Sequence, residues 1–423
     1  MAVIEFRAAL EAALPAGQLA QLRQVQQIAA ELGAPTYLVG GVARDLVLGR
    51  QPGDLDLVVQ ARGDNDDRAG PRLAQALARQ QGGAVTVHSA FGTATWVDPR
   101  GLPIDFATAR TETYARPAAL PTVTPAASIL ADLSRRDFTF NAMAIRLDGE
   151  LFGDILDPFQ GQDDLAAGQV RVLHAQSLQD DPTRLFRGAR YEQRFGFQLA
   201  RETLAQVPAA LAAIPDLSSA RVRHELELIL AEPNALAMLA RLDALDALAA
   251  IHPALRWGDA QALRAAAIPT LPVGDWHLAD PLEPLWLYLP LMLDGAAPDH
   301  ARAALARLDA NGRLVEAVLA AVNLRLASGP ASQVVAQLDP LSEAAVVAAY
   351  VLRPEIQPLL QQYLSRWRFV RSALTGDDLL ALGLKPGPDF RRWLWDLRAA
   401  RLDGAVADRA GELALIHQWT GVE

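Results

Sequence analysis

The hydrophobic pattern of the chain changes near residue 150, and this change limits the fold more than any other feature. Before it, short runs typical of β-strands cover Thr36–Val39, Leu55–Val59, Val85–His88, Thr93–Val97 and Ile104–Ala107. Helical stretches alternate with them at Val42–Leu48 and Leu73–Gln81. After about residue 165, Leu and Ala recur at helical spacing almost to the end. The pattern predicts an α+β protein: a small domain with a mixed β-sheet and helices, followed by helices only.

Proline and glycine divide the chain further. They predict four parts, with boundaries at 1–150, 151–232, 233–330 and 331–423. A Pro-rich and Ala-rich stretch between Tyr114 and Leu130 predicts a surface loop.

Composition excludes several classes of protein. The 423 residues include no Cys, so disulfides, thiolate zinc sites and Cys nucleophiles are ruled out. The seven His form no HExxH motif or His pair, which argues against a His-built metal site. No apolar run reaches the roughly 18 residues of a membrane span, and no signal peptide is apparent at the N-terminus. We therefore expect a cytoplasmic protein that does not enter membranes.

The most informative segment runs from Tyr37 to Gly49, with the sequence YLVGGVARDLVLG. A strand ends at Gly40 and Gly41, and a helix follows directly. Two glycines allow the backbone to approach a ligand closely, and free N–H groups at the helix start favour a phosphate. Arg44 lies near enough to reach the same anion. Alone, a Gly-Gly pair is more often an ordinary turn.

Two carboxylates follow at Asp54 and Asp56. Residues two apart on a strand point to one face, and Mg²⁺ prefers such oxygen ligands together with substrate phosphates. Alone, this pair is more often a solvated strand edge. The order strand, Gly-Gly, helix and DxD predicts nucleotidyl transfer with metal ligands Asp54 and Asp56.

This segment resembles the head-domain signature of the class II tRNA nucleotidyltransferase and bacterial poly(A) polymerase family, in the DNA polymerase β-like superfamily. The family pattern is GGxVRDxLLG followed by DxD. Here Ala43 replaces the usual Val, and Gly53 stands where a Lys often precedes the first Asp. The resemblance implies a third catalytic carboxylate on a neighbouring strand, and Asp105 is the candidate.

A second motif covers Arg135 to Ala144, RRDFTFNAMA, and resembles the family's RRDFTxNAMA element. Arg136 is suited to a triphosphate, and Asp137 and Asn141 share one face if the segment is helical. An ordinary helix start at Asp137 is the alternative. A carboxylate can accept from a ribose 2′-OH, and the resemblance implies that Asp137 contacts the ribose.

A third motif, QDDPTRLFRGARY, places Arg184, Arg187 and Arg190 at helical spacing after Asp181. Such an Arg stripe is equally often a solvated face. The motif resembles the family's EDxxRxxRAxRF element, which implies that Asp181 and Arg184 act as a protein template for the incoming base. Arg187 and Arg190 would then face the triphosphate or the RNA end.

The resemblance implies a catalytic head, a neck that recognises the base, a body, and a tail that binds tRNA. The expected reaction is template-independent addition of C and/or A to the tRNA 3′ end from CTP and ATP, with Mg²⁺. A poly(A) polymerase and a non-catalytic tRNA-binding protein are the alternatives. The product remains open among CCA, CC and A; the short stretch at 114–130 carries one charge, Arg116, which favours partial addition. The oligomeric state also remains open.

The charge is distributed unevenly. The net charge is −10, which argues against general affinity for nucleic acid. Residues 184–223 and 362–401 nevertheless each carry a local excess of four positive charges. All but one of the 39 basic residues are Arg. Codon or growth-temperature bias is one explanation, and recognition of phosphate by guanidinium groups is the other. Two basic helical strips on an acidic protein fit binding of one shaped RNA through its phosphates.

Overall fold

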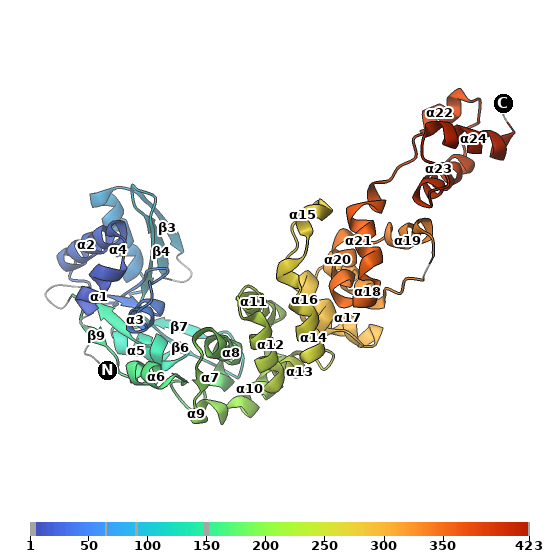
Figure 1. Cartoon of the computed structure of the whole chain (residues 1–423). Coiled ribbons are helices and arrows are strands. Elements are labelled where there is room, and N and C mark those ends of the chain that lie inside the picture. The colour runs from blue at the N-terminus through green and yellow to red at the C-terminus, as the bar shows by residue number, and fades with distance from the viewer. Residues whose placement is uncertain (1–5, 64–65, 89–91, 148–151, 328, 422–423) are drawn as a thin grey trace. The chain divides into compact units, whose positions relative to one another are not determined.

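The computed structural model describes residues 6–63, 66–88, 92–147, 152–327 and 329–421. The chain divides into two compact units (Figure 1). Unit 1 comprises Met1–Glu225 and Leu245–Ala250, and unit 2 comprises Leu226–Ala244 and Ile251–Glu423. Each unit is described by itself.

Unit 1 is built on a seven-stranded sheet among the described residues, in the order β3-β4-β5-β2-β1-β8-β9. The strands are β1 (Thr36–Val39), β2 (Asp56–Val59), β3 (Ala84–His88), β4 (Thr93–Val97), β5 (Pro103–Thr108), β8 (Ala144–Arg146) and β9 (Ile155–Leu156). Neighbouring strands are antiparallel except β2 and β5, which are parallel and place Asp56 directly opposite Asp105. This register places two acidic residues that are far apart in the sequence next to each other in the sheet.

One face of the sheet is covered by helices. Helix α4 (Ala69–Gln81) packs on β4 and β5, and α2 (Ala16–Glu31) packs on α4 (Figure 1). Side chains alternate along β4 and β5, so that Trp96 and Phe106 are buried while Asp105 is exposed. The alternation in β4 and β5 thus reflects a sheet with one buried face.

The other helices of unit 1 connect and flank the sheet. They are α1 (Phe6–Ala13), α3 (Gly41–Val47), α5 (Ile129–Ser134), α6 (Gly161–Ala167), α7 (Ser177–Asp180), α8 (Thr183–Phe195), α9 (Arg201–Leu204), α10 (Val207–Ala213) and α11 (Ser219–Leu230), the last of which continues into unit 2. Most of α13 (Ala247–Ile251) also belongs to unit 1. Two short strand pairs complete it: β6 (Arg110–Thr113) with β7 (Thr122–Pro125), and β10 (Gln169–Val170) with β11 (Gln198–Leu199).

The helices that follow along the chain are α12 (Ala235–Ala244), α13 (Ala247–Ile251), α14 (Asp259–Ala265), α15 (Val273–Trp276), α16 (Pro284–Met292), α17 (Pro298–Arg307), α18 (Gly312–Asn323), α19 (Ala331–Leu338), α20 (Glu343–Leu352), α21 (Gln357–Ser365), α22 (Gly376–Ala381), α23 (Pro388–Leu402) and α24 (Arg409–Thr420). Near the C-terminus, Leu374, Leu379, Leu397 and Ile416 form a separate core. Within the described ranges, no single helix is long and apolar enough to cross a membrane, although the bent pair α19–α20 passes the same length and composition test together.

The predicted α+β class is confirmed, and the five predicted strands agree with β1 to β5 within one residue at each end. The loop predicted between Tyr114 and Leu130 is wrong in part. Strand β7 lies inside it and pairs with β6, because Thr122, Val123 and Thr124 alternate as a strand between the prolines. The N-terminal helices α1 and α2 were not predicted.

Gly161 offers a test of the packing that supports this fold. A Cβ atom there would lie 2.5 Å from the carbonyl oxygen of Thr139, which is backbone and cannot rotate away. We expect Gly161→Ala to destabilise unit 1 by about 1–3 kcal/mol, as overpacking does. Urea unfolding measures the change. Gly63→Ala is the control, since a Cβ there meets nothing within 4 Å; equal stability of the two variants would contradict the packing described.

Candidate active site

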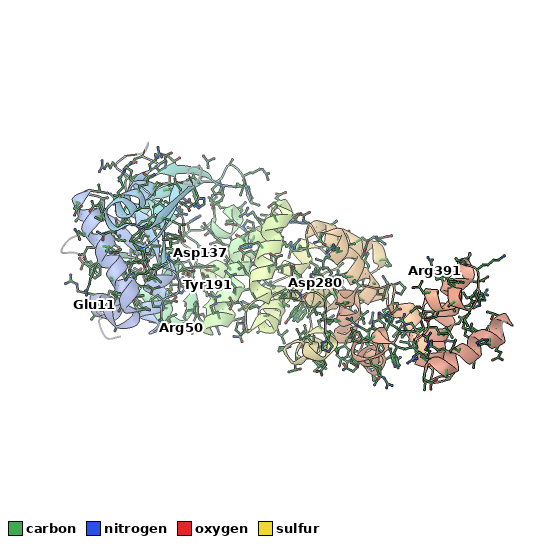
Figure 2. The ribbon with its side chains drawn as sticks, turned by 90° about the horizontal axis from the view of Figure 1, so that it is seen from above. Glu11, Arg50, Asp137, Tyr191, Asp280 and Arg391 are labelled. Carbon is green, nitrogen blue, oxygen red and sulfur yellow. The ribbon has the colours of Figure 1, made fainter. Side chains whose placement is uncertain are left out.

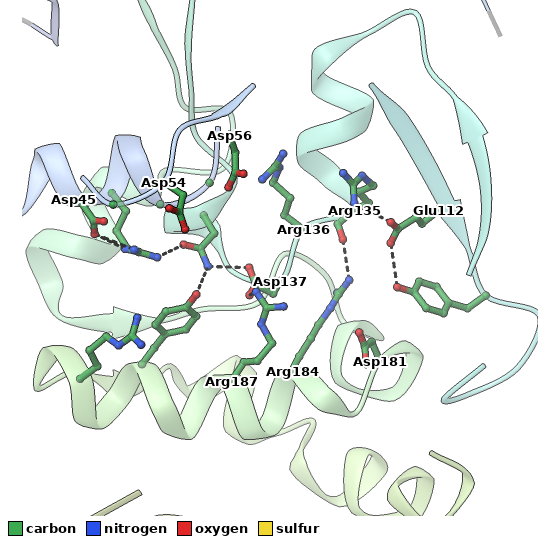
Figure 3. Close-up of a pocket in the computed structure, with 18 residues that line it drawn as sticks. Asp45, Asp54, Asp56, Glu112, Arg135, Arg136, Asp137, Asp181, Arg184 and Arg187 are labelled. Atoms are coloured by element: carbon green, nitrogen blue, oxygen red, sulfur yellow. Dashed lines mark hydrogen bonds and ion pairs between the residues drawn. The ribbon is translucent and has the colours of Figure 1, made fainter. Parts of the chain in front are cut away.

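A cavity of about 630 Å³ lies in unit 1 (Figure 3). It is lined by Gly40, Gly41, Arg44, Asp45, Gly53, Asp54, Asp56, Glu112, Tyr114, Arg135, Arg136, Asp137, Asn141, Asp181, Arg184, Arg187, Tyr191 and Arg194. All three sequence motifs therefore contribute to one site. Of the predicted site residues, only Asp105 and Arg190 are outside this lining.

Gly40 makes the turn between β1 and α3. Its φ of 71° lies in the region that favours glycine. A Cβ atom here would lie 3.5 Å from Nη1 of Arg136 and 3.9 Å from Oδ2 of Asp56. The glycine therefore lets the backbone turn beside both charged groups at the floor of the cavity.

Asp54 and Asp56 precede and begin strand β2, and Leu55 between them is buried. The alternation places both carboxylates on the cavity side. Asp105 lies opposite Asp56 on β5 and accepts a hydrogen bond from Thr95 Oγ1 at 2.5 Å. Asp105, Asp56 and Arg136 line a second cavity of about 460 Å³. The predicted third carboxylate is thus adjacent to the pair, on the neighbouring strand.

The electrostatics around Asp56 fit a cation. Desolvation raises the pKa of Asp56, and the negative charge of Asp105 raises it further, while Arg136 opposes the rise. In the part of the chain that the structure describes, no three His, Asp or Glu side chains gather as a complete metal site. Asp54 and Asp56 could each supply carboxylate oxygens to a divalent ion, which also binds water and substrate phosphates.

Arg44 is buried and already engaged. Its Nη1 donates to Oδ1 of Asn141 at 2.9 Å, and its guanidinium lies 5.5 Å and 5.1 Å from the ring centres of Tyr191 and Phe195. Asn141 in turn donates from Nδ2 to Asp137 Oδ1 at 2.9 Å and to the Tyr191 hydroxyl at 3.3 Å. Figure 2 labels Asp137 and Tyr191, the two residues that Asn141 connects. Arg44 thus holds Asn141 in place.

Asp137 forms an ion pair with Arg187 of α8, at 2.5 Å between Oδ2 and Nη2. Burial by itself would raise the pKa of Asp137, but Arg187 and the hydrogen bond from Asn141 lower it below its ordinary value. The charge of Asp137 in turn raises the pKa of Arg187. The pair joins the RRDFT segment to α8 across 50 residues of chain.

The remaining end of the cavity carries Asp181 and Arg184. Arg184 is 4% exposed; it donates to the Arg135 carbonyl at 2.8 Å and to Ser177 Oγ. Asp181 Oδ1 accepts from the Thr183 backbone N–H at 3.0 Å. Both side chains therefore have defined positions. Arg190 is buried on the same helix but does not line the cavity, and its role stays a prediction.

The sequence reasoning missed Glu112 and Tyr114. Glu112 accepts from Arg135 at 2.8 Å and from Arg110 at 3.2 Å, and the Tyr114 hydroxyl donates to it at 3.3 Å. Burial raises the pKa of Tyr114 to about 12. The alternating run RTET at 110–113 was the available signal, since it forms strand β6.

The Asp137–Arg187 pair gives a stability prediction with a defined pH dependence. The pKa of Asp137 is lowered in the folded state, so its stabilising effect exists above the unfolded value near 3.9 and is lost as pH falls through the folded value. Arg187→Met should cost about 1–3 kcal/mol near pH 7, less than a fully buried pair, because the Arg187 side chain is 38% exposed.

Urea unfolding at a series of pH values between 7 and 3 measures this effect. The difference between wild type and Arg187→Met should shrink toward the acidic end, and Arg187→Lys should retain part of the stability. A difference that is constant with pH would contradict the assignment.

Two family models match the chain. Residues 36–171 match the poly A polymerase head domain, and residues 196–257 match a probable RNA and SrmB-binding site of polymerase A. The first match spans the segments that supply Gly40, Asp54, Asp56 and Asp137.

Curated relatives extend over most of the chain. An A-adding tRNA nucleotidyltransferase of Halalkalibacterium halodurans is 32% identical over 94% of this chain and 92% of its own. A CC-adding tRNA nucleotidyltransferase of Deinococcus radiodurans is 35% identical, covering 91% and 89%. An A-adding enzyme of Geobacter sulfurreducens is 34% identical over 95% of this chain, which spans 47% of that relative's length.

A solved structure is similar to this chain over nearly all of its length. The Thermotoga maritima CCA-adding enzyme complexed with tRNA superposes with a TM-score of 0.77 at 26% identity, covering 98% of each chain. The resemblance predicted from the motifs is thereby confirmed. The chain belongs to the tRNA nucleotidyltransferase family that carries the poly(A) polymerase head domain.

Proposed function

We propose that this chain adds C and/or A to the 3′ end of tRNA, using CTP and ATP and releasing pyrophosphate. One observation carries the proposal: a single cavity holds the carboxylate pair Asp54 and Asp56 together with the Asp181 and Arg184 side chains. The first pair suits phosphoryl transfer and the second suits recognition of a base. The relatives named A-adding and CC-adding support the same reaction class.

At the phosphate end, Asp54 and Asp56 would hold Mg²⁺, with Asp105 as the third carboxylate. The bound ion supplies charge neutralisation for the triphosphate and for the leaving pyrophosphate. Arg136 lies beside Asp56 and offers N–H donors to phosphate oxygens. The tRNA 3′-hydroxyl loses its proton to solvent as its oxygen attacks the α-phosphate; the new P–O bond forms and the bond to pyrophosphate breaks. Positioning of the two substrates carries most of the rate enhancement.

In the middle of the cavity, Asp137 and Asn141 are suited to the ribose. Asp137 is ionised because its pKa is lowered, so it is an acceptor for hydroxyl protons. Arg44 fixes Asn141, and Arg187 fixes Asp137. The ribose would thus meet a carboxylate that Asn141 and Arg187 already hold in place, and whose buried Oδ2 accepts no hydrogen bond among the described residues; this favours selection of a nucleotide with a 2′-OH.

At the base end, Asp181 and Arg184 form a complementary acceptor and donor. Cytosine and adenine present an amino donor beside a ring-nitrogen acceptor, which match a carboxylate and a guanidinium. Uracil and guanine present the reverse order on that edge, so a buried charged group would stay unpaired, at a cost of about 1–3 kcal/mol or more. A site of this kind accepts CTP and ATP and rejects UTP and GTP.

The remaining assignments rest on the family likeness. We place base recognition in the neck at 151–232 and tRNA binding in the tail at 331–423, with the head at 1–150 and the body at 233–330. The reaction would take place in the cytoplasm. The connection after Tyr114 is short and carries Arg116 as its one charge, which favours addition of CC or A rather than the whole CCA end.

The catalytic assignment is tested with Asp54→Ala. Loss of one carboxylate should reduce incorporation by at least about 10³-fold while the fold is retained, because the divalent ion loses a ligand. EDTA should abolish wild-type activity and excess Mg²⁺ should restore it. The assay supplies purified protein with tRNA ending at the discriminator, at CC or at CCA, with CTP and ATP singly and together, followed by 3′-end sequencing.

The products separate the alternatives. One to three added nucleotides on tRNA support the proposal, and they identify CCA, CC or A addition. Long A tails on unrelated RNA would indicate a poly(A) polymerase. Binding of tRNA without any incorporation by the wild type would indicate a non-catalytic protein. Full activity of Asp54→Ala would refute the metal-ligand role.

Arg184→Ala tests the base template. Without the guanidinium donor, discrimination against UTP should fall by about tenfold or more, since each lost charged hydrogen bond contributes about 1.5–3 kcal/mol. Single-nucleotide incorporation with CTP, ATP, UTP and GTP gives the kcat/KM for each. A variant that is slower with every nucleotide but equally selective would exclude this role for Arg184.

A further inference from the structure

Arg221 of helix α11 makes two contacts that no motif of the active site predicts. Its Nη2 donates to Oδ1 of Asp181 at 2.6 Å, and its Nη1 donates to the carbonyl oxygen of Ala118 at 3.0 Å. The Arg221 and Asp181 side chains are only 22% and 20% exposed. One guanidinium fork therefore joins the proposed base-reading carboxylate to a distant segment of the head.

Ala118 lies at the tip of the hairpin formed by β6 and β7. It is buried, and its φ of 59° is unusual for a residue with a side chain. Its N–H donates to the carbonyl oxygen of Asp180 at 3.2 Å. The hairpin tip is thus bonded both to the residue before Asp181 and to Arg221. The same hairpin carries Tyr114 into the lining of the cavity.

The two oxygens of Asp181 differ in their surroundings. Oδ1 accepts from Arg221, from the Thr183 backbone N–H at 3.0 Å and from Thr183 Oγ1 at 2.6 Å. Among the described residues, the hydrogen bonds to this carboxylate all go to Oδ1 and none goes to Oδ2. Three donors on one oxygen fix the rotation of the carboxylate, and they leave the other oxygen as the acceptor open to a ligand.

We propose that Arg221 is a positioning residue for base selection. It anchors Asp181 Oδ1, so that Oδ2 keeps one direction toward the incoming base, and it ties this direction to the conformation of the β6–β7 hairpin tip. This inference rests on the proposed function. It adds a residue outside the cavity lining that acts on the base through Asp181.

Loss of the anchor has a defined consequence. In Arg221→Met an unbranched side chain is kept but both donors are removed, so Asp181 Oδ1 keeps only its two bonds from Thr183 and the carboxylate is held less firmly. A carboxylate without a fixed direction rejects a mismatched base less well. We expect the ratio of kcat/KM for UTP to kcat/KM for the preferred nucleotide to rise about tenfold. Arg221→Lys retains the charge but has no fork, and the rise should be smaller.

The experiment measures kcat/KM for all four nucleotides on one tRNA substrate, with thermal unfolding of each variant as the check on folding. Arg201→Met is the matched control, because Arg201 is exposed on α9 and does not line the cavity. Ala118→Pro disturbs the hairpin tip and leaves Arg221 in place: proline has no N–H to donate to the Asp180 carbonyl and cannot adopt the positive φ of Ala118. We expect it to raise the UTP ratio about threefold.

The outcomes are distinct. A raised ratio in Arg221→Met, partial rescue in Arg221→Lys and no change in Arg201→Met support the inference. If the wild type is selective and Arg221→Met rejects UTP equally well, the inference about Arg221 is wrong, and the proposed function is unaffected. A uniform loss with all nucleotides also overturns it, since that result means a structural role only. An unchanged ratio in Ala118→Pro overturns the link to the hairpin. Absence of incorporation by the wild type overturns the proposed function together with this inference.

Discussion

The ion pair between Asp137 and Arg187 is the constraint on which the rest of the site depends. A buried carboxylate is tolerated only when a cation and hydrogen bonds compensate its lost hydration, and Arg187 and Asn141 do so here. Since Asp137 precedes strand β8 and Arg187 is in helix α8, the pair holds the sheet and this helix together. The carboxylates at β2 and the Asp181–Arg184 end consequently face the same cavity (Figure 3).

Paired charges recur in and around this cavity. Arg135 contacts Glu112, Arg136 contacts Asp132, and Arg221 contacts Asp181. Each guanidinium presents several N–H groups in a fixed plane, so it can satisfy a carboxylate and still donate elsewhere. The pairs set side-chain positions before a nucleotide binds, which lowers the entropy cost of binding. This gives a structural use for some of the Arg residues that make up nearly all of the basic side chains.

The sequence predicted much of the fold and the site because their signals are local. Strands β1 and β2 are short apolar runs, and β3 to β5 alternate in burial. Gly40, Asp54, Asp56, Asp137 and Asp181 stand in short contiguous motifs. The β6–β7 hairpin was missed because three prolines outweighed the alternation at Thr122–Thr124. Arg44 was expected to bind an anion, yet its buried position commits it to Asn141 and to two aromatic rings, which no local pattern encodes.

By itself the sequence determined the α+β class, the family, and the residue types at each motif. Only the tertiary structure decided which residues meet. Parallel pairing of β2 with β5 set Asp105 beside Asp56, and the hairpin tip came to share Arg221 with Asp181. The physical reason is the distance along the chain over which each effect acts. Periodicity and turn chemistry depend on residues a few positions apart. Strand register and the contacts of buried charged groups join distant residues, such as the partners of Arg221, which are 40 and 103 positions away.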